Sequence, residues 1–386
     1  MTQAYIVEAA RTAGGKRKGA FAGVHPADLG AAVVDALVAR SGVDPAAIDD
    51  LILGCVTQGG EQSFAFGRNV VLASSLPDSV PAVTIDRQCG SSQQALHFAA
   101  QAVMSGTQDL VIAAGAESMT RVPMGSNYTL HAQAGMGEGP WPRSIQQRYG
   151  VKEFSQFHGA QAIANKYGFS REDMDAYALD SHRKAAAAIA SGAFAGEIVP
   201  FTTPEGTVIH DEGVRADSSM DALASLKTLV ENGTITAGNA SQMTDGASGV
   251  LVANEAALKR HNLTPIARIV NLTVTAGDPV IMLEEPIPAT RRAFERSGLK
   301  LEDIDLFEVN EAFASIPMAW LKAIGADPAK LNIHGGAIAL GHPLGATGTK
   351  LMTTLVHALR AQGKRYGLQT MCEGGGIANV TIVEAL

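Results

Sequence analysis

"TIDRQCGSSQQALHFAAQAV", residues 84–103, places a single cysteine between a strand-like run and a helix-like run. Cys89 closes the β-rich part, and the apolar residues after it recur at the spacing of one helical face. Beside the free N–H groups and positive end of a helix, the pKa of a thiol falls and the nucleophilic thiolate is favoured. The residues alone leave a reactive thiol and a buried structural thiol equally open, because free cysteine is commonly buried.

The order of loop, helix and glycine-ended strand occurs twice in the chain. In the first copy, "CGSS" leads into a helix expected over 91–105 and then into the strand "LVIAAGAES". In the second copy, "GHPLGATG" leads into a helix expected over 347–361 and then into "LQTMCEGGG". Two such copies can pack as a pseudo-symmetric pair whose loops converge on one site. The alternation of strands and helices in both halves predicts βαβ units and a largely parallel sheet.

The pattern divides the chain into three parts. We expect an N-terminal α/β half over 1–117, completed by about 249–264, and a C-terminal α/β half over 265–386. Between them, residues 118–248 begin with interspersed methionine, aromatic, glycine and proline residues and end in an irregular stretch. This part carries two helix candidates, 156–167 and 171–191. Because so long an excursion is usually functional or disordered, and because it holds two helices, we predict a functional inserted loop domain.

Composition sets the class of protein. The 386 residues are 46% hydrophobic, enough for a large core, and the net charge of −8 argues against a broad nucleic-acid or anionic-membrane surface. The chain has three cysteines, Cys55, Cys89 and Cys372. A low and odd number of cysteines argues against a disulfide framework and indicates a reducing compartment. The start "MTQAYIVEAART" lacks the features of a signal peptide, and no apolar run has the length of a membrane span. We therefore expect a cytoplasmic protein.

A glycine-rich loop in the second half holds a candidate base. The stretch "NIHGGAIALGHPLGATGT", residues 332–349, suits a backbone that lines a ligand or touches another loop. His342, placed rigidly before Pro343, has the position of a general base or an oxyanion donor. The alternative is a loop histidine that satisfies its hydrogen bonds locally, and we expect that structural role for His334.

Two strand ends add further candidates. Cys372 ends an apolar strand and precedes a glycine turn whose N–H groups can point at a developing negative charge, although a core cysteine at a strand end has the same pattern. Asn310 and Glu311 in "VNEAF" follow a strand, at the sheet edge where open α/β sheets gather ligands. The sequence holds no CxxC or His/Cys metal spacing and no GxGxxG or Walker motif. A nucleophile, a base and oxyanion donors without a cofactor indicate acyl transfer through a covalent intermediate.

Five motifs then appear in the order found in the thiolases: "DRQCGSSQQA", "GNASQMTDGA", "VNEAFAS", "GGAIALGHPLGATG" and "CEGGG". The chain resembles this family over essentially its whole length. The resemblance implies a duplicated βαβαβαββ core of five layers, α-β-α-β-α, with a loop domain inserted over the active site. It also implies CoA thioester substrates, no cofactor other than CoA as a substrate, no metal, and a homodimer or homotetramer.

The resemblance also implies a role for each matched residue. Cys89 is expected to carry the acyl group, and Cys372 to exchange protons with the acetyl-CoA carbon or the CoA thiol. His342 is expected to activate Cys89 and to form one oxyanion hole together with a water held by Asn310. The backbone N–H groups of Cys89 and Gly374 are expected to form a second oxyanion hole.

The same resemblance suggests binding positions for the rest of the substrate. Ser241 in "GNAS" is similar to a serine that contacts pantetheine, and Arg215 in "DEGVR" to a residue near the adenine-phosphate part of CoA. Met282 and Phe313 are candidates for the acyl pocket. Two stretches at expected pocket positions, "IMLEEP" and "QFHG", depart from the pattern of short-chain enzymes, which bears on acyl-chain length.

These residues favour thiolytic cleavage of a 3-oxoacyl-CoA by CoA, giving acetyl-CoA and a shortened acyl-CoA. The biosynthetic direction, condensation of two acetyl-CoA into acetoacetyl-CoA, uses the same residues and stays open. Ketoacyl synthases normally pair a cysteine with two histidines, so Cys372 argues against that class. Two non-enzymatic alternatives are a CoA-ester-binding protein and a redox sensor that closes a Cys89–Cys372 disulfide.

Overall fold

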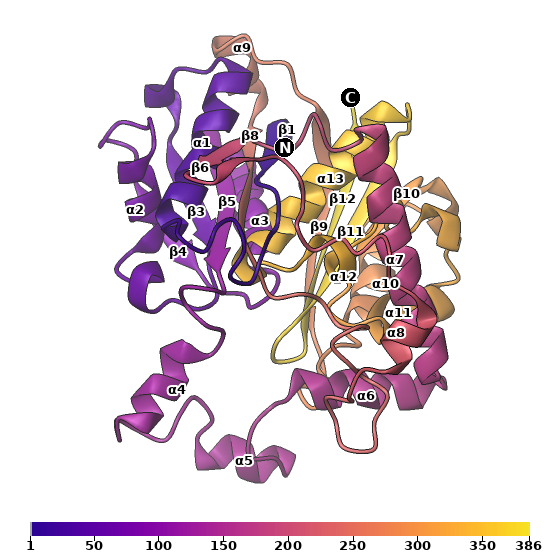
Figure 1. Ribbon diagram of the computed structural model, residues 1–386. Coiled ribbons are helices and arrows are strands. Elements are labelled where there is room, and N and C mark those ends of the chain that lie inside the picture. The colour runs from indigo at the N-terminus through magenta and orange to yellow at the C-terminus, as the bar shows by residue number, and fades with distance from the viewer. Residues whose placement is uncertain (1) are drawn as a thin grey trace.

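The computed structural model describes residues 2–386, and its centre is a mixed β-sheet in two halves (Figure 1). The strand order is β10-β11-β12-β9-β1-β8-β5-β3-β4, with β2 beside β8. The strands of this sheet are β1 (Tyr5–Arg11), β2 (Gly15–Lys16), β3 (Asp50–Gly54), β4 (Ala82–Ile85), β5 (Leu110–Ser118), β8 (Thr244–Ala253), β9 (Ala267–Ala276), β10 (Leu306–Val309), β11 (Tyr366–Glu373) and β12 (Ile377–Ala385). The halves join where β1 pairs with β9, at Tyr5–Arg268 and Ile6–Ala267.

Both halves repeat one pairing scheme, as the sequence predicts. In the first half, β3 runs parallel to β5, β5 antiparallel to β8, and β8 antiparallel to β1. In the second half, β10 runs parallel to β11, β11 antiparallel to β12, and β12 antiparallel to β9. The expectation of a largely parallel sheet is wrong, because strands such as β12 return through a tight turn without a crossover helix.

Helices complete five layers. The central helices α3 (Ser91–Ser105) and α13 (Thr347–Ala361) lie between the two sheet halves (Figure 1). The outer helices are α1 (Pro26–Ser41) and α2 (Phe66–Ala73) on the first half, and α10 (Pro286–Ser297) and α11 (Ser315–Ile324) on the second. The remaining helices of the two halves are the short α9 (Glu255–Arg260) and α12 (Ala337–Leu340). This arrangement confirms the predicted fold class.

The stretch between the halves carries five helices and a hairpin. They are α4 (Ser126–Gln133), α5 (Arg143–Tyr149), α6 (Gln156–Tyr167), α7 (Arg171–Ser191), β6 (Phe201–Thr203), β7 (Gly206–Val208) and α8 (Met220–Ala224). The helices α6 and α7 match the predicted ranges, whereas α4 and α5 project from the body and were not expected (Figure 1). Neither α4 nor α5 buries a residue, so no apolar period marks them in the sequence. The long strand β8 begins at Thr244, inside the stretch expected to be irregular.

Across residues 2–386, no helix is both long enough and apolar enough to cross a membrane.

Candidate active site

Cys89 lies between β4 and α3, as the sequence predicts. Its neighbour Gln88 has a φ of 49°, a left-handed conformation that turns the chain sharply into the helix. Gly90 forms the N-cap of α3, and a Cβ added there would lie 1.9 Å from Oε1 of Glu373. The entrance of α3 is therefore packed against the end of β11, and a side chain at position 90 would displace the carboxylate of Glu373.

The electrostatic surroundings of Cys89 differ from the expectation. Burial, followed by the nearby charge of Glu373, raises the pKa of Cys89 to about 12. The positive end of α3 does not overcome these two effects, because a helix terminus is worth only about 0.3–1 kcal/mol whereas one pKa unit is 1.36 kcal/mol. The residue as a whole is only partly covered. Cys89 therefore rests as a thiol and needs a base in order to react.

His342 has the hydrogen bonds of such a base. Its Nδ1 lies 2.6 Å from Oγ1 of Thr347, whose hydroxyl donates to the carbonyl of Pro343 at 2.8 Å. A hydroxyl has one proton, so Thr347 must accept from Nδ1–H, and the lone pair of the neutral ring is then on Nε2. That Nε2 atom is buried and has no hydrogen-bond partner among residues 2–386. Burial, and then the charge of Lys350, lowers the pKa of His342 to about 3, so the ring is neutral.

The loop that carries His342 is seated against the first half of the molecule. Glu117, at the end of β5, accepts hydrogen bonds from the backbone N–H groups of Val56, Thr57 and Gly345 at 2.8, 3.0 and 2.9 Å. At the start of α13, the backbone N–H of residue 349 donates to the Ser92 hydroxyl of α3 at 3.0 Å. The loops before α3 and α13 therefore converge. Sequence reasoning missed Glu117, although a lone acid at the end of an apolar strand is a usable signal.

Cys372 and Gly374 complete this convergence from β11. Burial, followed by the neighbouring charge of Cys89, raises the pKa of Cys372 well above its usual value. A Cβ on Gly374 would lie 2.8 Å from Oε1 of Gln88, so the turn after β11 touches the residue that precedes Cys89. The turn is closed by two glycines with φ of 86° and 76°. The two predicted cysteines thus share one site.

Asn310 and Glu311 have separate surroundings although they are adjacent. Both side-chain polar atoms of Asn310 are buried without a hydrogen-bond partner among residues 2–386. Its backbone N–H donates to the carbonyl of Thr370, which lies on β11 two residues before Cys372. Glu311 instead accepts from Ser181 of α7 at 2.7 Å and from the backbone of Ile338 at 3.2 Å. Glu311 therefore has a structural role, whereas Asn310 is free to bind a ligand or water.

Buried polar atoms without partners mark this region. Buried polar groups are hydrogen-bonded in the great majority of cases, so each exception needs a reason. His342 Nε2, the Asn310 amide and both carboxylate oxygens of Glu373 are such exceptions within residues 2–386. All three belong to the loops and strand ends that meet around Cys89. Sequence reasoning did not single out Glu373, because its place in the glycine turn suggested only backbone chemistry.

The two residues expected to contact CoA lie on adjoining segments. The Ser241 backbone N–H donates to the carbonyl of Ala312 at 2.9 Å, which fixes it beside the segment that carries Asn310. Its neighbour Gln242 donates through Nε2 to the carbonyl of Gly213 at 2.8 Å and so ties this segment to that of Arg215. The side chain of Arg215 is exposed.

The expected acyl-pocket residues also come together. Met282 and Phe313 lie in one buried apolar cluster with Cys372. The ring of Phe157, in "QFHG" on α6, meets the ring of Phe313 edge-on with centroids 5.7 Å apart. Met282 has a φ of 62°, so the loop that presents it adopts a left-handed turn.

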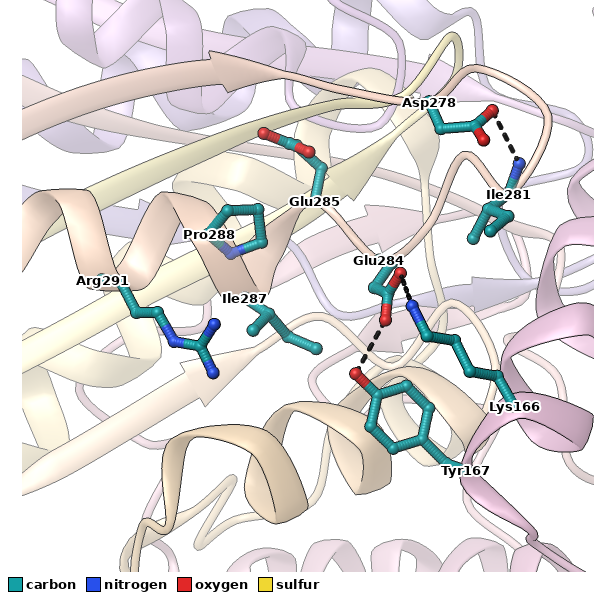
Figure 2. A pocket seen from close by; sticks show the side chains of 9 residues that line it. All are labelled: Lys166, Tyr167, Asp278, Ile281, Glu284, Glu285, Ile287, Pro288 and Arg291. Atoms are coloured by element: carbon teal, nitrogen blue, oxygen red, sulfur yellow. Dashed lines mark hydrogen bonds and ion pairs between the residues drawn. The ribbon is translucent and has the colours of Figure 1, made fainter.

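The loop that carries Met282 is held by hydrogen bonds from side chains of α6. Glu284 accepts hydrogen bonds from Lys166 Nζ and the Tyr167 hydroxyl, both at 2.7 Å, beside a surface pocket (Figure 2). A Cβ on Gly159 would lie 2.6 Å from the carbonyl of Ile281, so α6 and this loop touch directly. The two stretches that depart from the short-chain pattern are therefore in contact with each other.

The site has the parts of an enzyme that transfers acyl groups through a thiol: a thiol on a partly covered residue, a neutral imidazole with a free nitrogen, and a second thiol. Among residues 2–386, no group of three or more His, Cys, Asp or Glu side chains is arranged to hold a metal ion.

Comparison with known proteins agrees with this class. Residues 4–256 match the thiolase N-terminal domain, and residues 263–385 match the thiolase C-terminal domain. The chain is 54% identical to a steroid 3-ketoacyl-CoA thiolase of Mycobacterium tuberculosis, over 100% of this chain and 95% of that protein. It is 41% identical to a 3-ketoacyl-CoA thiolase of Bacillus subtilis over 100% of both chains. A 3-ketoacyl-CoA thiolase of Saccharophagus degradans is also 41% identical, over 98% of this chain and 97% of that protein. The chain belongs to the thiolase family.

Proposed function

We propose that this thiolase cleaves a 3-oxoacyl-CoA with CoA and yields acetyl-CoA and an acyl-CoA shortened by two carbons. The observation that carries the proposal is the convergence of Cys89, His342 and Cys372, with unpartnered polar atoms on His342 and Asn310 beside them. The printed names of the relatives, all 3-ketoacyl-CoA thiolases, support the same reaction.

In the first half-reaction, Cys89 Sγ attacks the C3 ketone carbon while His342 Nε2 takes the thiol proton. The C2–C3 bond then breaks, and its electron pair leaves on acetyl-CoA as the enolate. His342 now carries a proton on Nε2 and donates it as a hydrogen bond to the enolate oxygen, with a water held by Asn310 as the second donor. The Cys372 thiol protonates C2, acetyl-CoA departs, and Cys89 retains the acyl group.

In the second half-reaction, the Cys372 thiolate takes the proton of the CoA thiol, and the CoA sulfur attacks the Cys89 thioester. The backbone N–H groups of Cys89 and Gly374 hold the oxyanion of the tetrahedral intermediate. Cys89 leaves as a thiolate and recovers its proton from His342. The high pKa of the resting Cys89 is matched to this cycle, because the thiolate is formed only when a base and an electrophile are both present.

Mass spectrometry tests the covalent step. Incubation with a 3-oxoacyl-CoA without CoA should add one acyl group to the peptide that contains Cys89, and later addition of CoA should remove it. Peptides with Cys55 and Cys372 serve as internal controls and should stay unmodified. An acyl group on either of them in place of Cys89, or none at all, contradicts the proposal.

We further propose that the acyl group is larger than acetyl. The stretches that carry Met282 and Phe157 depart from the short-chain pattern and pack with Phe313, and one relative is named for a steroid substrate. The test compares kcat/KM for acetoacetyl-CoA with that for longer and bulkier 3-oxoacyl-CoAs. A clear preference for acetoacetyl-CoA would favour the biosynthetic direction instead.

The anchored loop provides a second test of this specificity. Glu284→Ala removes the acceptor for Lys166 and Tyr167, so the loop with Met282 should become less fixed. We expect the ratio of kcat/KM between bulky and short substrates to change by about three- to tenfold, with a smaller change for Glu284→Gln, which keeps an acceptor. An unchanged ratio would exclude this loop from acyl selection.

The proposed setting of the reaction has four parts. Residues 118–248 form a loop domain over the CoA site, with Ser241 at the pantetheine and Arg215 at the adenine-phosphate part, between halves 1–117 (with 249–264) and 265–386. CoA is a substrate, and no cofactor or metal is needed. The protein is a homodimer or homotetramer, which is supported by β4, an edge strand that pairs only with β3 among residues 2–386 and carries the 46% exposed Val83. The free thiols support a cytoplasmic location.

A further inference from the structure

A buried lysine lies directly behind the loop of His342. Lys350, in the first turns of α13, is only 4% exposed. Its Nζ donates to the carbonyls of Leu340 and Gly341 at 2.5 and 3.1 Å. These are the two residues that precede His342, and Gly341 has a φ of 81° in contact with Thr244. The ammonium group therefore holds the backbone from which the imidazole extends.

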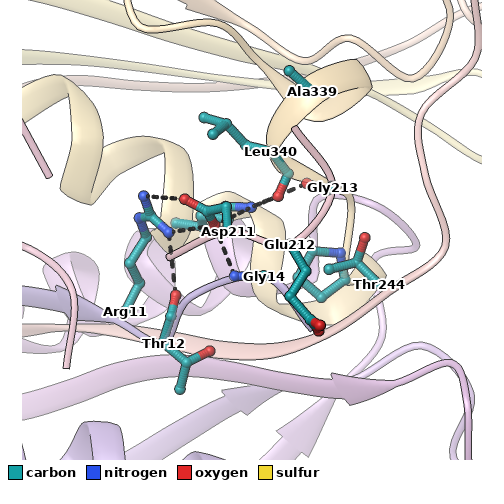
Figure 3. Close-up of polar contacts among 12 residues, drawn as sticks. Arg11, Thr12, Gly14, Asp211, Glu212, Gly213, Thr244, Ala339 and Leu340 are labelled. Atoms are coloured by element: carbon teal, nitrogen blue, oxygen red, sulfur yellow. Dashed lines mark hydrogen bonds and ion pairs between the residues drawn. The ribbon is translucent and has the colours of Figure 1, made fainter. Parts of the chain in front are cut away.

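Lys350 is held in turn by a cluster of buried charges. Figure 3 shows two members of this cluster, Arg11 and Asp211, side by side. Its Nζ is 4.0 Å from Oδ1 of Asp211, and Asp211 accepts two hydrogen bonds from Arg11 at 2.8 and 3.1 Å. Arg11 also binds Glu197 at 2.5 Å. Two cations and two carboxylates balance each other, and the side chains of all four are at most 5% exposed. Such a cluster cannot lose one member without leaving an uncompensated charge.

We propose that Lys350 is a positioning residue for His342, which fixes the backbone before the imidazole and places a positive charge behind it at neutral pH. The proposal rests on the role of His342 as the base that deprotonates Cys89. Thr347, one turn earlier on α13, holds the ring itself. One helix end therefore orients both the backbone and the ring of the same histidine.

Charged and titratable groups approach the His342 loop from several elements. Lys350 on α13 bonds the loop directly, Glu117 on β5 accepts from Gly345 within it, and Asp211 in the inserted stretch lies 4.0 Å from Lys350 Nζ. Cys89 and Cys372 lie on the loop and strand end that converge with it. Burial lowers the pKa of Lys350 to about 8, while Asp211 opposes this shift, so the ammonium is charged at neutral pH. Its charge disfavours imidazolium and so makes protonated His342 a stronger acid. The proton taken from Cys89 is then readily returned when the acyl group leaves.

Three substitutions separate position from charge. Lys350→Arg keeps the charge and the donors, Lys350→Gln keeps a donor without the charge, and Lys350→Met removes both. The exposed Lys259→Met on α9 is the control for a lost lysine charge. The measurement is kcat/KM for thiolysis from pH 3 to pH 9, with the acyl adduct on Cys89 and thermal unfolding recorded for each variant at each pH.

We expect Lys350→Arg to retain the acid limb of the wild-type profile. In Lys350→Gln and Lys350→Met this limb should move upward by about one pH unit, a tenfold loss at low pH, because imidazolium is no longer disfavoured. Lys350→Met should also lose about tenfold at the plateau, since the backbone anchors are gone. Lys259→Met should match the wild type.

An acid limb that stays in place in folded Lys350→Gln would overturn the electrostatic part of the proposal. A plateau in Lys350→Met equal to that of the wild type would overturn the positioning part. If Lys350→Met does not fold, the proposal is tested by comparing kcat/KM of Lys350→Gln with that of Lys350→Arg, because both variants keep hydrogen-bond donors. Absence of a Cys89 adduct in the wild type would instead reject the proposed function itself, independently of any variant.

Discussion

At the scale of single residues, the two groups proposed to react first, Cys89 and His342, rest uncharged. The pKa of Cys89 is raised to about 12, and that of His342 is lowered to about 3, in each case chiefly by burial. Both shifts oppose formation of a thiolate–imidazolium pair before the substrate arrives. Water and solvent electrophiles therefore find a thiol, and the thiolate is produced only during the attack on the ketone.

The first prediction concerns alkylation of the resting enzyme. A raised thiol pKa means that the thiolate fraction of Cys89 increases with pH across the whole neutral range. The rate of reaction with iodoacetamide, followed by the mass of the peptide with Cys89, should therefore keep rising from pH 6 to pH 9. A rate that is constant over this range would indicate a preformed ion pair and contradict the uncharged resting state.

The second prediction concerns the tautomer of His342. Thr347→Val removes the acceptor of Nδ1–H while it keeps the shape of the side chain, so the ring loses its orientation and its free Nε2. We expect kcat/KM to fall by about 10- to 100-fold, since general base catalysis contributes about 10²–10⁴. Thr347→Ser should recover most of this loss. Equal activity of the Val and Ser variants would show that the hydroxyl does not set the tautomer.

At the scale of elements, the site depends on how closely α3 and α13 approach. A Cβ on Gly348 would lie 2.1 Å from the backbone nitrogen of Gln93, so the two helices touch at their backbones. This contact brings the loop of His342 to the loop of Cys89. A larger residue would push the helices apart and separate the base from the nucleophile.

The third prediction follows from this contact. Gly348→Ala should lower the free energy of unfolding by about 1–3 kcal/mol, because backbone atoms cannot yield to the added methyl group. The activity should fall together with the stability. Gly23→Ala is the matched control, since no atom lies within 4 Å of its added Cβ, and it should change the stability by less than about 0.5 kcal/mol. Chemical unfolding measures the free energy of unfolding of both variants. An equal loss of stability in Gly348→Ala and Gly23→Ala would contradict the steric argument.

Elements with an apolar period could be predicted from sequence, and those without one could not. The helices α6 and α7 bury a stripe of small and apolar residues and were placed correctly. The exposed helices α4 and α5 have no such stripe. Motif positions such as Cys89, His342 and Asn310 were found because their residue types carry chemistry. Glu373 and Lys350 were not, because burial, which gives them their importance, depends on distant parts of the chain.

At the scale of the whole molecule, the buried charges join three parts of the chain. Arg11 belongs to β1, Lys350 to α13, and Glu197 and Asp211 to the stretch between the two halves. The partners of Arg11 are 186 and 200 positions away in the sequence. No local pattern encodes such pairs, so sequence reasoning had no means to find them. The cluster couples the inserted stretch to the loop of His342.

The last prediction concerns Asp211, whose loss leaves Arg11 and Lys350 with one carboxylate. Asp211→Asn should lower the free energy of unfolding at pH 7 by about 3–5 kcal/mol, measured by urea unfolding at fixed protein concentration. Burial raises the pKa of Asp211, but Arg11 and Lys350 outweigh it and bring that pKa below its usual value. The stabilisation by Asp211 is therefore complete above about pH 4 and is lost as the pH falls further. Below about pH 4, the free energies of unfolding of the wild type and of Asp211→Asn should converge.

Arg183→Met, which breaks an exposed pair with Asp180, is the control for this experiment. Because exposed ion pairs contribute about 0–1 kcal/mol, its effect at pH 7 should be several-fold smaller than that of Asp211→Asn. The two substitutions differ mainly in the burial of the charge that each leaves behind. If Asp211→Asn costs no more than Arg183→Met, the buried cluster does not hold the inserted stretch to the core, and the loop of His342 must be fixed by its own hydrogen bonds alone.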